Sequence, residues 1–336
     1  MKHRTGLLYS EAYTRHLTGP THPERPERIR HVYEHLKKQA WFEKLSLTCP
    51  NRPPLADLEW IHAVHTPAYT ERVKNACLAG HPTIDSLDTE ISHDSYETAC
   101  LAAGGVLSLI DKVMSNEVAN GFSLIRPPGH HAEKEIALGF CLFNHAAIAA
   151  RYLQKKHGLG RILIVDWDVH HGNGTQNIFY EDPSVFYFSV HQFPYYPGTG
   201  SAEEQGKDRG VGATLNVPLK AGCGDAEYRE VFEKVFYPRA SEFEPDFVLI
   251  SAGFDAHQND PLGHMNVTAA GYEGMTDVVK AVARESAQGR IVSLLEGGYD
   301  LDALAESVGK HMETLLNPDI LFQPPAKRRR KKEKKF

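Results

Sequence analysis

One short segment carries side chains that are well suited to bind a metal ion. Residues 161–165 form a run rich in apolar residues, typical of a β-strand, and Asp166, Asp168, His170 and His171 follow before a glycine-rich turn. In an extended chain, side chains two residues apart point to the same side, so Asp168 and His170 can reach one ion together. Asp-x-Asp-x-His-His also holds more ligand-type groups than the capping of a helix requires. The segment therefore indicates part of a metal site.

A further ligand must come from another part of the chain. Catalytic zinc usually takes three protein ligands and leaves one position for water or substrate. Asp255 is the best candidate for the third ligand, because it follows a second strand-like run, residues 247–254, and Gly253 frees the backbone just before it. A lone Asp after a strand is more often a helix cap, so its spacing alone does not decide between the two roles.

Two more strand-like runs end in polar side chains. Residues 121–126 lead into a Pro-Pro-Gly sequence and then His130 and His131, and residues 290–295 lead into Glu-Gly-Gly and then Tyr299. In open parallel α/β sheets, the ligand crevice lies at the carboxyl ends of the strands. We therefore expect the side chains that follow all four strands to converge on one cleft.

The elements that must position these side chains are expected to form one large α/β domain. The chain has 336 residues, of which 41% are hydrophobic, and no Pro/Ser-rich linker separates the motifs. Helical patterns lie between or beside the strand-like runs, at residues 26–39, 95–116, 141–156, 226–241 and 268–286. This order favours a mainly parallel β-sheet flanked by helices on both faces, with the active site at the C-terminal ends of the strands. We assign residues 1–322 to the domain and 323–336 to a basic tail that we expect to be disordered.

Charge and composition limit the partners. The net charge is −6 although the last ten residues hold eight Lys/Arg and one Glu, so the rest of the chain is strongly acidic. An acidic body suits a cationic, lysine-rich protein substrate, and only the tail offers a contact for nucleic acid or a nuclear signal. No signal peptide and no run of about 20 apolar residues is present, which predicts a cytoplasmic protein without membrane contact. The five cysteines form no Cys-x-x-Cys pair, so neither a disulfide framework nor a structural zinc cluster is indicated. The sequence does not predict an oligomeric state.

Five motifs occur in order along the chain. They are Arg126-Pro-Pro-Gly-His-His-Ala132, Gly139-Phe-Cys-Leu-Phe-Asn144, Val165-Asp-Trp-Asp-Val-His-His-Gly-Asn-Gly-Thr-Gln176, Ser251-Ala-Gly-Phe-Asp255 and Leu295-Glu-Gly-Gly-Tyr299. Together they closely resemble the zinc-dependent histone deacetylase family, with the character of its class II enzymes and their bacterial relatives. The resemblance extends from about His16 to about Leu316. It implies the arginase/deacetylase fold and hydrolysis of the amide bond of acetyl-lysine side chains, which releases acetate and free lysine.

The resemblance implies a role for each polar side chain. Asp168, His170 and Asp255 resemble the zinc ligands; zinc polarises a carbonyl group and lowers the pKa of its water to about 7. His131 resembles the general base and His130 a source of electrostatic stabilisation. Tyr299 resembles the tyrosine that polarises the scissile carbonyl.

Each histidine is expected to have a partner that fixes its ring. Asp166 falls where His130 should find one, and Asn173 falls where His131 should. An amide is uncharged and stabilises an imidazolium less than a carboxylate does, so the pKa of His131 should be low, which suits a base.

A narrow tunnel for the acyl-lysine side chain is also implied. The resemblance implies that Gly139, Phe140, Tyr196 and Gly298 line it. The aromatic walls at Phe140 and Tyr196 suit a lysine stem, because they bury its methylenes at about 0.8 kcal/mol each. Leu262 stands where polyamine-hydrolysing relatives are expected to have an acidic Glu that binds a remote amine. Leucine cannot make that contact, so acylated lysines of peptides or proteins, including histone-like basic proteins, are the preferred substrates.

The resemblance further implies one or two structural potassium ions. The candidates for an inner potassium site are Asp166, Asp168, His170, Ser189 and Val190, and those for an outer site are Phe179, Asp182 and Val185.

Three alternatives stay open. An acetylpolyamine or other small-amide hydrolase could use the same scaffold. A two-metal ureohydrolase related by fold would need more bridging carboxylates, and Asp255 is followed two residues later by His257 rather than by another Asp. A non-catalytic acyl-lysine binding protein would keep the site without turnover.

Overall fold

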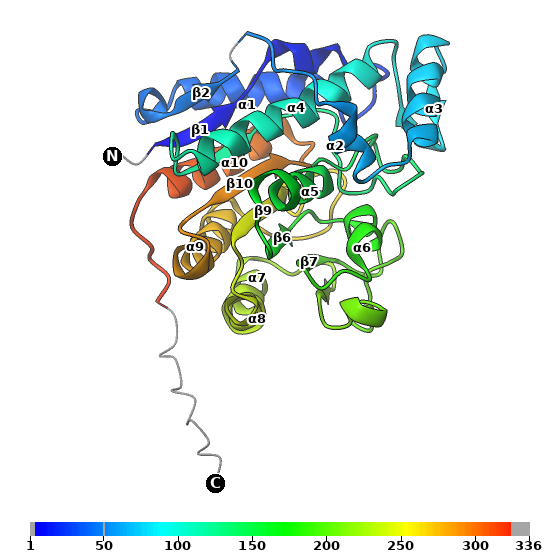
Figure 1. Ribbon diagram of the computed structural model, residues 1–336. Coiled ribbons are helices and arrows are strands. Elements are labelled where there is room, and N and C mark those ends of the chain that lie inside the picture. The colour runs from blue at the N-terminus through cyan, green and yellow to red at the C-terminus, as the bar shows by residue number, and fades with distance from the viewer. Residues whose placement is uncertain (1–3, 50, 324–336) are drawn as a thin grey trace.

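The structure is a computed structural model that describes residues 4–49 and 51–323. Within these residues, eight strands form a sheet in which every neighbouring pair is parallel (Figure 1). From edge to edge they are β2 (Ser46–Thr48), β1 (Thr5–Leu8), β5 (Asn120–Ser123), β10 (Ile291–Leu295), β9 (Phe247–Ala252), β6 (Ile162–Asp166), β7 (Val185–Gln192) and β8 (Thr214–Leu219). The predicted α/β class with a mainly parallel sheet is confirmed.

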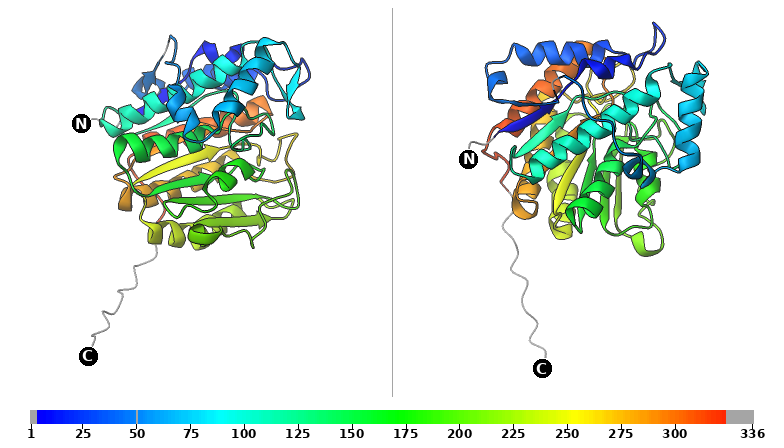
Figure 2. Two further views of the ribbon diagram at one scale, coloured as in Figure 1. Left: turned by 45° about the vertical axis from the view of Figure 1, so that its right-hand side comes forward. Right: turned by 45° about the horizontal axis from the view of Figure 1, so that its top comes forward.

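Helices cover the sheet in two layers (Figures 1 and 2). In one layer, α4 (Ser95–Met114) packs against α5 (His145–His157). In the other, α10 (Leu301–Leu316) packs between α1 (Glu27–Lys37) and α9 (Ala269–Ser286). The remaining elements include α2 (Leu58–His62), α3 (Pro67–Leu78), α6 (Asn173–Phe179), α7 (Asp225–Val231), α8 (Tyr237–Phe243) and a hairpin of β3 (Thr83–Ile84) and β4 (Ser86–Glu90).

The central strands explain why the sheet is parallel and enclosed. Every residue of β6, β9 and β10 is buried, and these strands are almost continuous apolar runs. Strands that are buried on both faces have this pattern, because helices cover both sides. The polar side chains that follow them can therefore gather only at the strand ends, beyond the apolar core.

Two predicted helices differ from the structure. The helix expected at residues 141–156 begins at His145, because the Asn144 side chain accepts a hydrogen bond from the Ala147 backbone N–H at 2.9 Å and caps the helix. The helix expected at 226–241 is divided into α7 and α8 by a π-helical turn at Phe232–Phe236. The other three predicted helices agree with α1, α4 and α9 to within two residues.

Some elements were not predicted, among them β1, β2, β7, β8 and α10. Of the predicted tail at 323–336, only Gln323 lies among the described residues. No helix in the described part of the chain combines the length and apolar character needed to cross a membrane. The cytoplasmic or nuclear location stays a prediction.

Candidate active site

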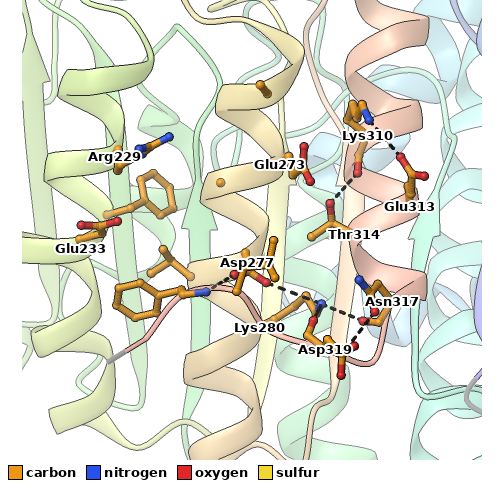
Figure 3. A pocket seen from close by; sticks show the side chains of 16 residues that line it. Arg229, Glu233, Glu273, Asp277, Lys280, Lys310, Glu313, Thr314, Asn317 and Asp319 are labelled. Atoms are coloured by element: carbon orange, nitrogen blue, oxygen red, sulfur yellow. Dashed lines mark hydrogen bonds and ion pairs between the residues drawn. The ribbon is translucent and has the colours of Figure 1, made fainter. Parts of the chain in front are cut away.

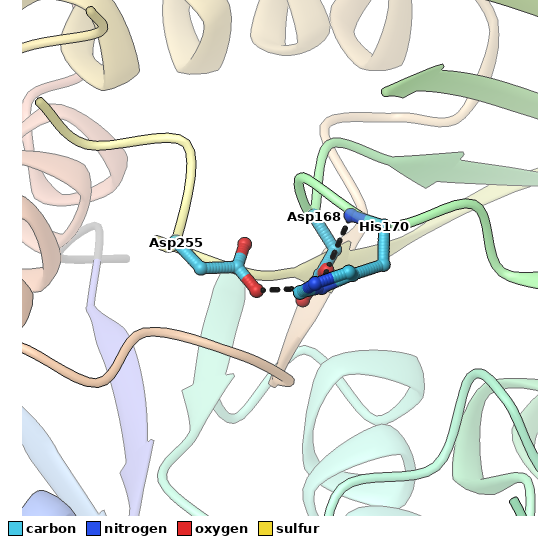
Figure 4. Close-up of side chains that lie close together, drawn as sticks. All are labelled: Asp168, His170 and Asp255. Carbon is cyan, nitrogen blue, oxygen red and sulfur yellow. Dashed lines mark hydrogen bonds and ion pairs between the residues drawn. The ribbon is translucent and has the colours of Figure 1, made fainter. Parts of the chain in front are cut away.

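Three predicted metal ligands lie together at the ends of two neighbouring strands (Figure 4). One ligand atom each from Asp168, His170 and Asp255 lies within 4.8 Å of the others. Asp168 and His170 follow β6, and Asp255 follows β9, its neighbour in the sheet. His170 Nδ1 lies 3.0 Å from Asp168 Oδ1 and 3.2 Å from Asp255 Oδ2. The structure therefore gathers two carboxylates and one imidazole in a set that fits zinc.

The surroundings of the Asp255 carboxylate favour binding of a cation. Asp255 Oδ1 accepts a hydrogen bond from the Val169 backbone N–H at 2.8 Å, whereas Oδ2 is buried and faces His170 Nδ1, another of the predicted ligands, at 3.2 Å. Burial and the neighbouring Asp168 carboxylate raise the pKa of Asp255 to about 7. Two buried carboxylates this close together are costly unless a cation compensates their charge. The trio therefore fits a divalent cation.

Glycine makes room for the trio. A Cβ atom on Gly297 would lie 2.0 Å from Asp255 Oδ2 and 2.6 Å from Asp168 Oδ2. A Cβ atom on Gly253 would lie 2.1 Å from Asp168 Oδ2. The Gly297 backbone N–H also donates to Asp168 Oδ2 at 2.8 Å. The chain after β10 therefore approaches the carboxylates more closely than any residue with a side chain could.

The predicted histidine pair lies beside the trio with the expected partners. His130 Nδ1 is 3.1 Å from Asp166 Oδ2, and His131 Nδ1 is 2.8 Å from Asn173 Oδ1. The centres of the His131 and His170 rings are 5.9 Å apart. Tyr187 also donates its hydroxyl to Asp166 Oδ2 at 3.0 Å, which fixes that carboxylate.

The two histidines have opposite electrostatic environments. Burial lowers the pKa of His130, but the Asp168 and Asp166 carboxylates outweigh burial and raise it to about 10. Burial and the neighbouring His130 and His170 hold the pKa of His131 well below its usual range. The surrounding charges therefore favour the protonated form of His130 and the neutral form of His131.

The loop that carries Tyr299 is anchored by groups that the sequence analysis did not identify. Arg28 is fully buried and donates to the backbone oxygens of Glu296 and Gly298, both at 2.6 Å, and its guanidinium lies 4.9 Å from the centre of the Tyr299 ring. Asp260 Oδ2 accepts from the Tyr299 backbone N–H at 2.6 Å. Burial raises the pKa of Tyr299 well above its ordinary value, so its hydroxyl stays available as a donor.

The expected tunnel residues lie next to this chemistry. The Tyr196 ring meets His131 edge-on at 5.2 Å between centres, and the Phe140 ring meets Tyr299 edge-on at 5.9 Å. Gly139 has a φ of +54°, and a Cβ atom there would lie 2.3 Å from the His131 ring. Tyr195, which was not predicted, stacks on the His170 ring at 5.6 Å. Gly298 has a φ of +119°, which lets the chain turn into Tyr299.

The expected potassium positions fall in two places. Asp166 and Ser189 are register partners on β6 and β7, next to the metal trio, and Val190 follows Ser189. At the other end of β7, the Phe179 and Asp182 backbone oxygens accept hydrogen bonds from the N–H groups of Asp182 and Val185 at 2.9 and 3.4 Å. These placements do not test the assignment to potassium.

The anchors that sequence analysis missed differ in how visible they were. Asp260 stands five residues after Asp255 and just before a proline, so its proximity to the motif was a usable signal. Arg28 is separated from the Tyr299 loop by about 270 residues, and nothing local to the sequence connects them. Glu24 lies four residues before Arg28 on the way into α1 and forms a buried ion pair with it at 3.0 Å.

A separate surface pocket lies between α7, α9, α10 and the segment 317–322 (Figure 3). Lys280, nearly buried there, donates to the backbone oxygens of Asn317 and Asp319 at 2.8 and 2.7 Å. These contacts fasten the end of the described chain to α9. None of the candidate catalytic residues lines this pocket.

Comparison with known proteins agrees with the geometry. Residues 22–315 match the histone deacetylase domain family. A probable deacetylase of Archaeoglobus fulgidus is 42% identical over 298 residues, which cover 89% of this chain and 82% of that protein. The human polyamine deacetylase HDAC10 is 40% identical over 304 residues, which cover 87% of this chain but only 44% of that protein. The crystal structure of the HDA15 HD domain superposes with a TM-score of 0.88 at 39% identity, covering 94% of this chain and 89% of that one. The chain belongs to the histone deacetylase family.

Proposed function

We propose that this protein uses zinc to hydrolyse the amide bond of acetyl-lysine side chains in peptides or proteins, releasing acetate and free lysine. The observation that carries the proposal is the gathering of Asp168, His170 and Asp255 beside a neutral, oriented His131. Amide hydrolysis needs an electrophilic catalyst and a base at one place, and this site offers residues for both.

Asp168, His170 and Asp255 would hold the zinc ion. The gathering of three ligand atoms within 4.8 Å of one another and the space left by Gly253 and Gly297 support this assignment. When bound, zinc supplies Lewis acidity that polarises a carbonyl group and lowers the pKa of water to about 7.

His131 would take the proton of the attacking water and return it to the leaving amine. Its Nδ1 atom faces Asn173 Oδ1, which requires a proton on Nδ1 and leaves the Nε2 lone pair free. His130, paired with Asp166, keeps a positive charge nearby as negative charge develops on the substrate. Tyr299 would donate its hydroxyl to the developing oxyanion.

Lysine side chains are proposed as substrates in preference to polyamines. Leu262 carries no charge with which to bind a remote amine. Phe140 and Tyr196, placed against Tyr299 and His131, suit an unbranched methylene stem. The acidic body would attract basic, histone-like protein segments. Acetylpolyamine hydrolysis is the second candidate, because a relative at 40% identity is named a polyamine deacetylase.

We also propose that the protein binds one or two structural potassium ions. Asp166, Asp168, His170, Ser189 and Val190 would form the inner site, and Phe179, Asp182 and Val185 the outer one. The register pairing of Asp166 with Ser189 brings two of the inner residues side by side and supports the inner site.

One experiment tests metal, reaction and substrate together. The purified full chain is analysed for bound metal and assayed with acetyl-lysine peptides, acetylputrescine and acetylspermidine, each with and without a chelator or a hydroxamate. We expect about one zinc per chain, faster turnover of peptides than of polyamines, and loss of turnover with either inhibitor. Stoichiometric peptide binding without acetate release would contradict the proposal and favour a binding protein.

A further inference from the structure

The partner of His131 has a partner of its own. Asn173 Nδ2 lies 2.8 Å from Glu133 Oε1, on the side of the amide opposite to the contact between Oδ1 and His131 Nδ1. Glu133 is two residues after His131 and half-buried at the edge of the site. The three side chains therefore form a chain of hydrogen bonds from the site toward the surface. Asn173 Nδ2 also lies 3.5 Å from the His131 carbonyl oxygen, a longer contact than the one to Glu133.

This arrangement matters because an amide has two different ends. Asn173 can turn its oxygen toward His131, which requires a proton on Nδ1, or turn its NH2 group toward His131, which requires the proton on Nε2. Only the first orientation leaves Nε2 free to accept a proton. An asparagine partner therefore does not by itself decide whether His131 can act as a base.

Glu133 removes this ambiguity. A carboxylate accepts hydrogen bonds and does not donate them, so the amide atom that faces Glu133 must be the NH2 group. The oxygen then has to face His131. The opposite orientation would place the amide oxygen against a carboxylate oxygen at about hydrogen-bond distance, which costs both the bond and the repulsion between acceptors.

Glu133 is itself held in place. Its Oε1 atom also accepts from Asn177 Nδ2 at 2.9 Å, and its backbone N–H donates to the Ile136 carbonyl oxygen at 2.9 Å. A Cβ atom on Gly174 would lie 2.3 Å from the Ala132 backbone oxygen, so the start of α6 packs directly on the segment that carries Glu133. The acceptor is therefore fixed relative to the amide that it orients.

The other histidine supplies an internal contrast. His130 pairs with the carboxylate of Asp166, whose two oxygens both accept, so its proton position needs no further group to decide it. Of these two histidines, only His131 has an amide partner, and a carboxylate, Glu133, contacts the far end of that amide.

We propose that Glu133 is a positioning residue that fixes the orientation of the Asn173 amide and thereby holds His131 in the tautomer with its proton on Nδ1. The catalytic consequence rests on the proposed function, because it needs His131 as the base. The orientation itself does not rest on it.

The first test replaces Glu133 by Gln, which has the same shape without the charge. Gln can donate as well as accept, so both orientations of Asn173 become hydrogen-bonded and the preference weakens. We expect kcat to fall on the order of tenfold with KM and melting temperature unchanged. Glu135→Gln is the matched control, since Glu135 is an exposed acid two residues away and its side chain makes no contact with Asn173. Equal activities of the two variants would overturn the proposal.

The second test reverses the sign of the effect. Asn173→Asp gives His131 a partner that accepts at both oxygens, so it needs no orienting group, and it faces repulsion from Glu133. In that background, Glu133→Gln should raise kcat, whereas in the original background it lowers kcat. A loss of similar size in both backgrounds would show that Glu133 acts only on general structure and would contradict the proposal.

A third measurement does not depend on activity. In the protein as purified, labelled with ¹⁵N-histidine, the His131 nitrogen signals should show a proton on Nδ1, and Glu133→Gln should add a population with the proton on Nε2. An unchanged tautomer in Glu133→Gln would contradict the proposal even if the protein turned out not to be a hydrolase. Absence of turnover in the unaltered protein would count against the proposed function alone.

Discussion

Asp260 joins the backbones of Tyr299 and Leu262 through one carboxylate. Its Oδ2 atom accepts from the Tyr299 backbone N–H at 2.6 Å, and its Oδ1 atom accepts from the Leu262 backbone N–H at 2.9 Å. The residue proposed to stabilise the oxyanion and the residue proposed to select lysine over polyamine are thus held by the same side chain. Asp260 is buried, so water cannot readily replace either hydrogen bond, and losing one of them costs free energy.

Asp260→Asn should lower kcat without removing the metal. The amide of Asn has one acceptor where the carboxylate has two, so either the Tyr299 or the Leu262 contact must be lost. We expect kcat to fall about 10- to 100-fold, with metal content unchanged. Steady-state kinetics and metal analysis measure this, with Asp302→Asn, an exposed residue on α10, as control. Full activity of Asp260→Asn would show that the contact does not position Tyr299.

Tyr299→Phe and Asp168→Ala should separate oxyanion stabilisation from metal binding. Phe keeps the ring that packs against Phe140 and Arg28 and loses only the hydroxyl. Removing one oxyanion donor typically lowers kcat by about 10²- to 10³-fold. Asp168→Ala should lose both metal and turnover, because it removes a proposed ligand. If Tyr299→Phe kept its activity, the assigned role would be refuted.

Gly297→Ala should disturb the metal site by steric contact alone. The added Cβ atom would meet Asp255 Oδ2 at 2.0 Å and Asp168 Oδ2 at 2.6 Å, so at least one carboxylate must move. We expect zinc affinity to fall by about 10- to 100-fold, measured by competition with a chelating dye. Gly274→Ala on α9 is the control, because a Cβ atom there meets nothing within 4 Å. Unchanged affinity in Gly297→Ala would place the metal elsewhere.

The strands that carry chemistry were predictable because apolar runs and the polar groups after them are both local features. Asp168 and His170 are two residues apart, and the prediction that they share one side assumed an extended chain; the structure instead brings them together in a bend after β6. Their meeting with Asp255 also required that β6 and β9 be neighbours, and sequence periodicity does not give strand order. The edge strand β2 and its neighbour β1 are short, at three and four residues, and gave too little pattern to recognise.

The residues that position the catalytic groups were harder to find for a physical reason. Arg28 holds the Tyr299 loop through backbone oxygens, which every residue has, so no side-chain pattern marks the contact at its other end. Glu133 contacts Asn173, and its proposed effect reaches His131 only through that side chain. Such contacts depend on how loops from distant strands pack together. Motifs report the groups that do the chemistry and leave the supporting groups unmarked.

Leu262→Glu should shift the preference toward acetylpolyamines. The new carboxylate would pair with a remote ammonium group of acetylspermidine and leave the acetamide end unaffected. We expect the ratio of kcat/KM for acetylspermidine to that for an acetyl-lysine peptide to rise about tenfold, which corresponds to about 1.4 kcal/mol. Leu262→Gln is the uncharged control, and the gain should shrink at high ionic strength. A ratio that does not change would show that position 262 lies out of reach of the substrate.

His311→Gln should make the stability of the fold less sensitive to acid. His311 is fully buried, with Nδ1 2.7 Å from Thr276 Oγ1 and Nε2 2.9 Å from Ser293 Oγ, and burial lowers its pKa from 6.5 to about 3. Below pH 6.5, His311 binds a proton in the unfolded chain but stays neutral in the folded protein, so the free energy of unfolding falls as the pH falls toward 3. Between pH 7.5 and 5, this histidine should lower the free energy of unfolding by about 2 kcal/mol. The free energy of unfolding of the glutamine variant should therefore fall by about 2 kcal/mol less over the same pH range, as measured by urea unfolding at both pH values. Substitution of the exposed His81 by Gln should leave the difference between the two pH values unaltered. The same acid sensitivity in His311→Gln as in the unaltered protein would mean that His311 also binds a proton in the folded protein, which would contradict the prediction.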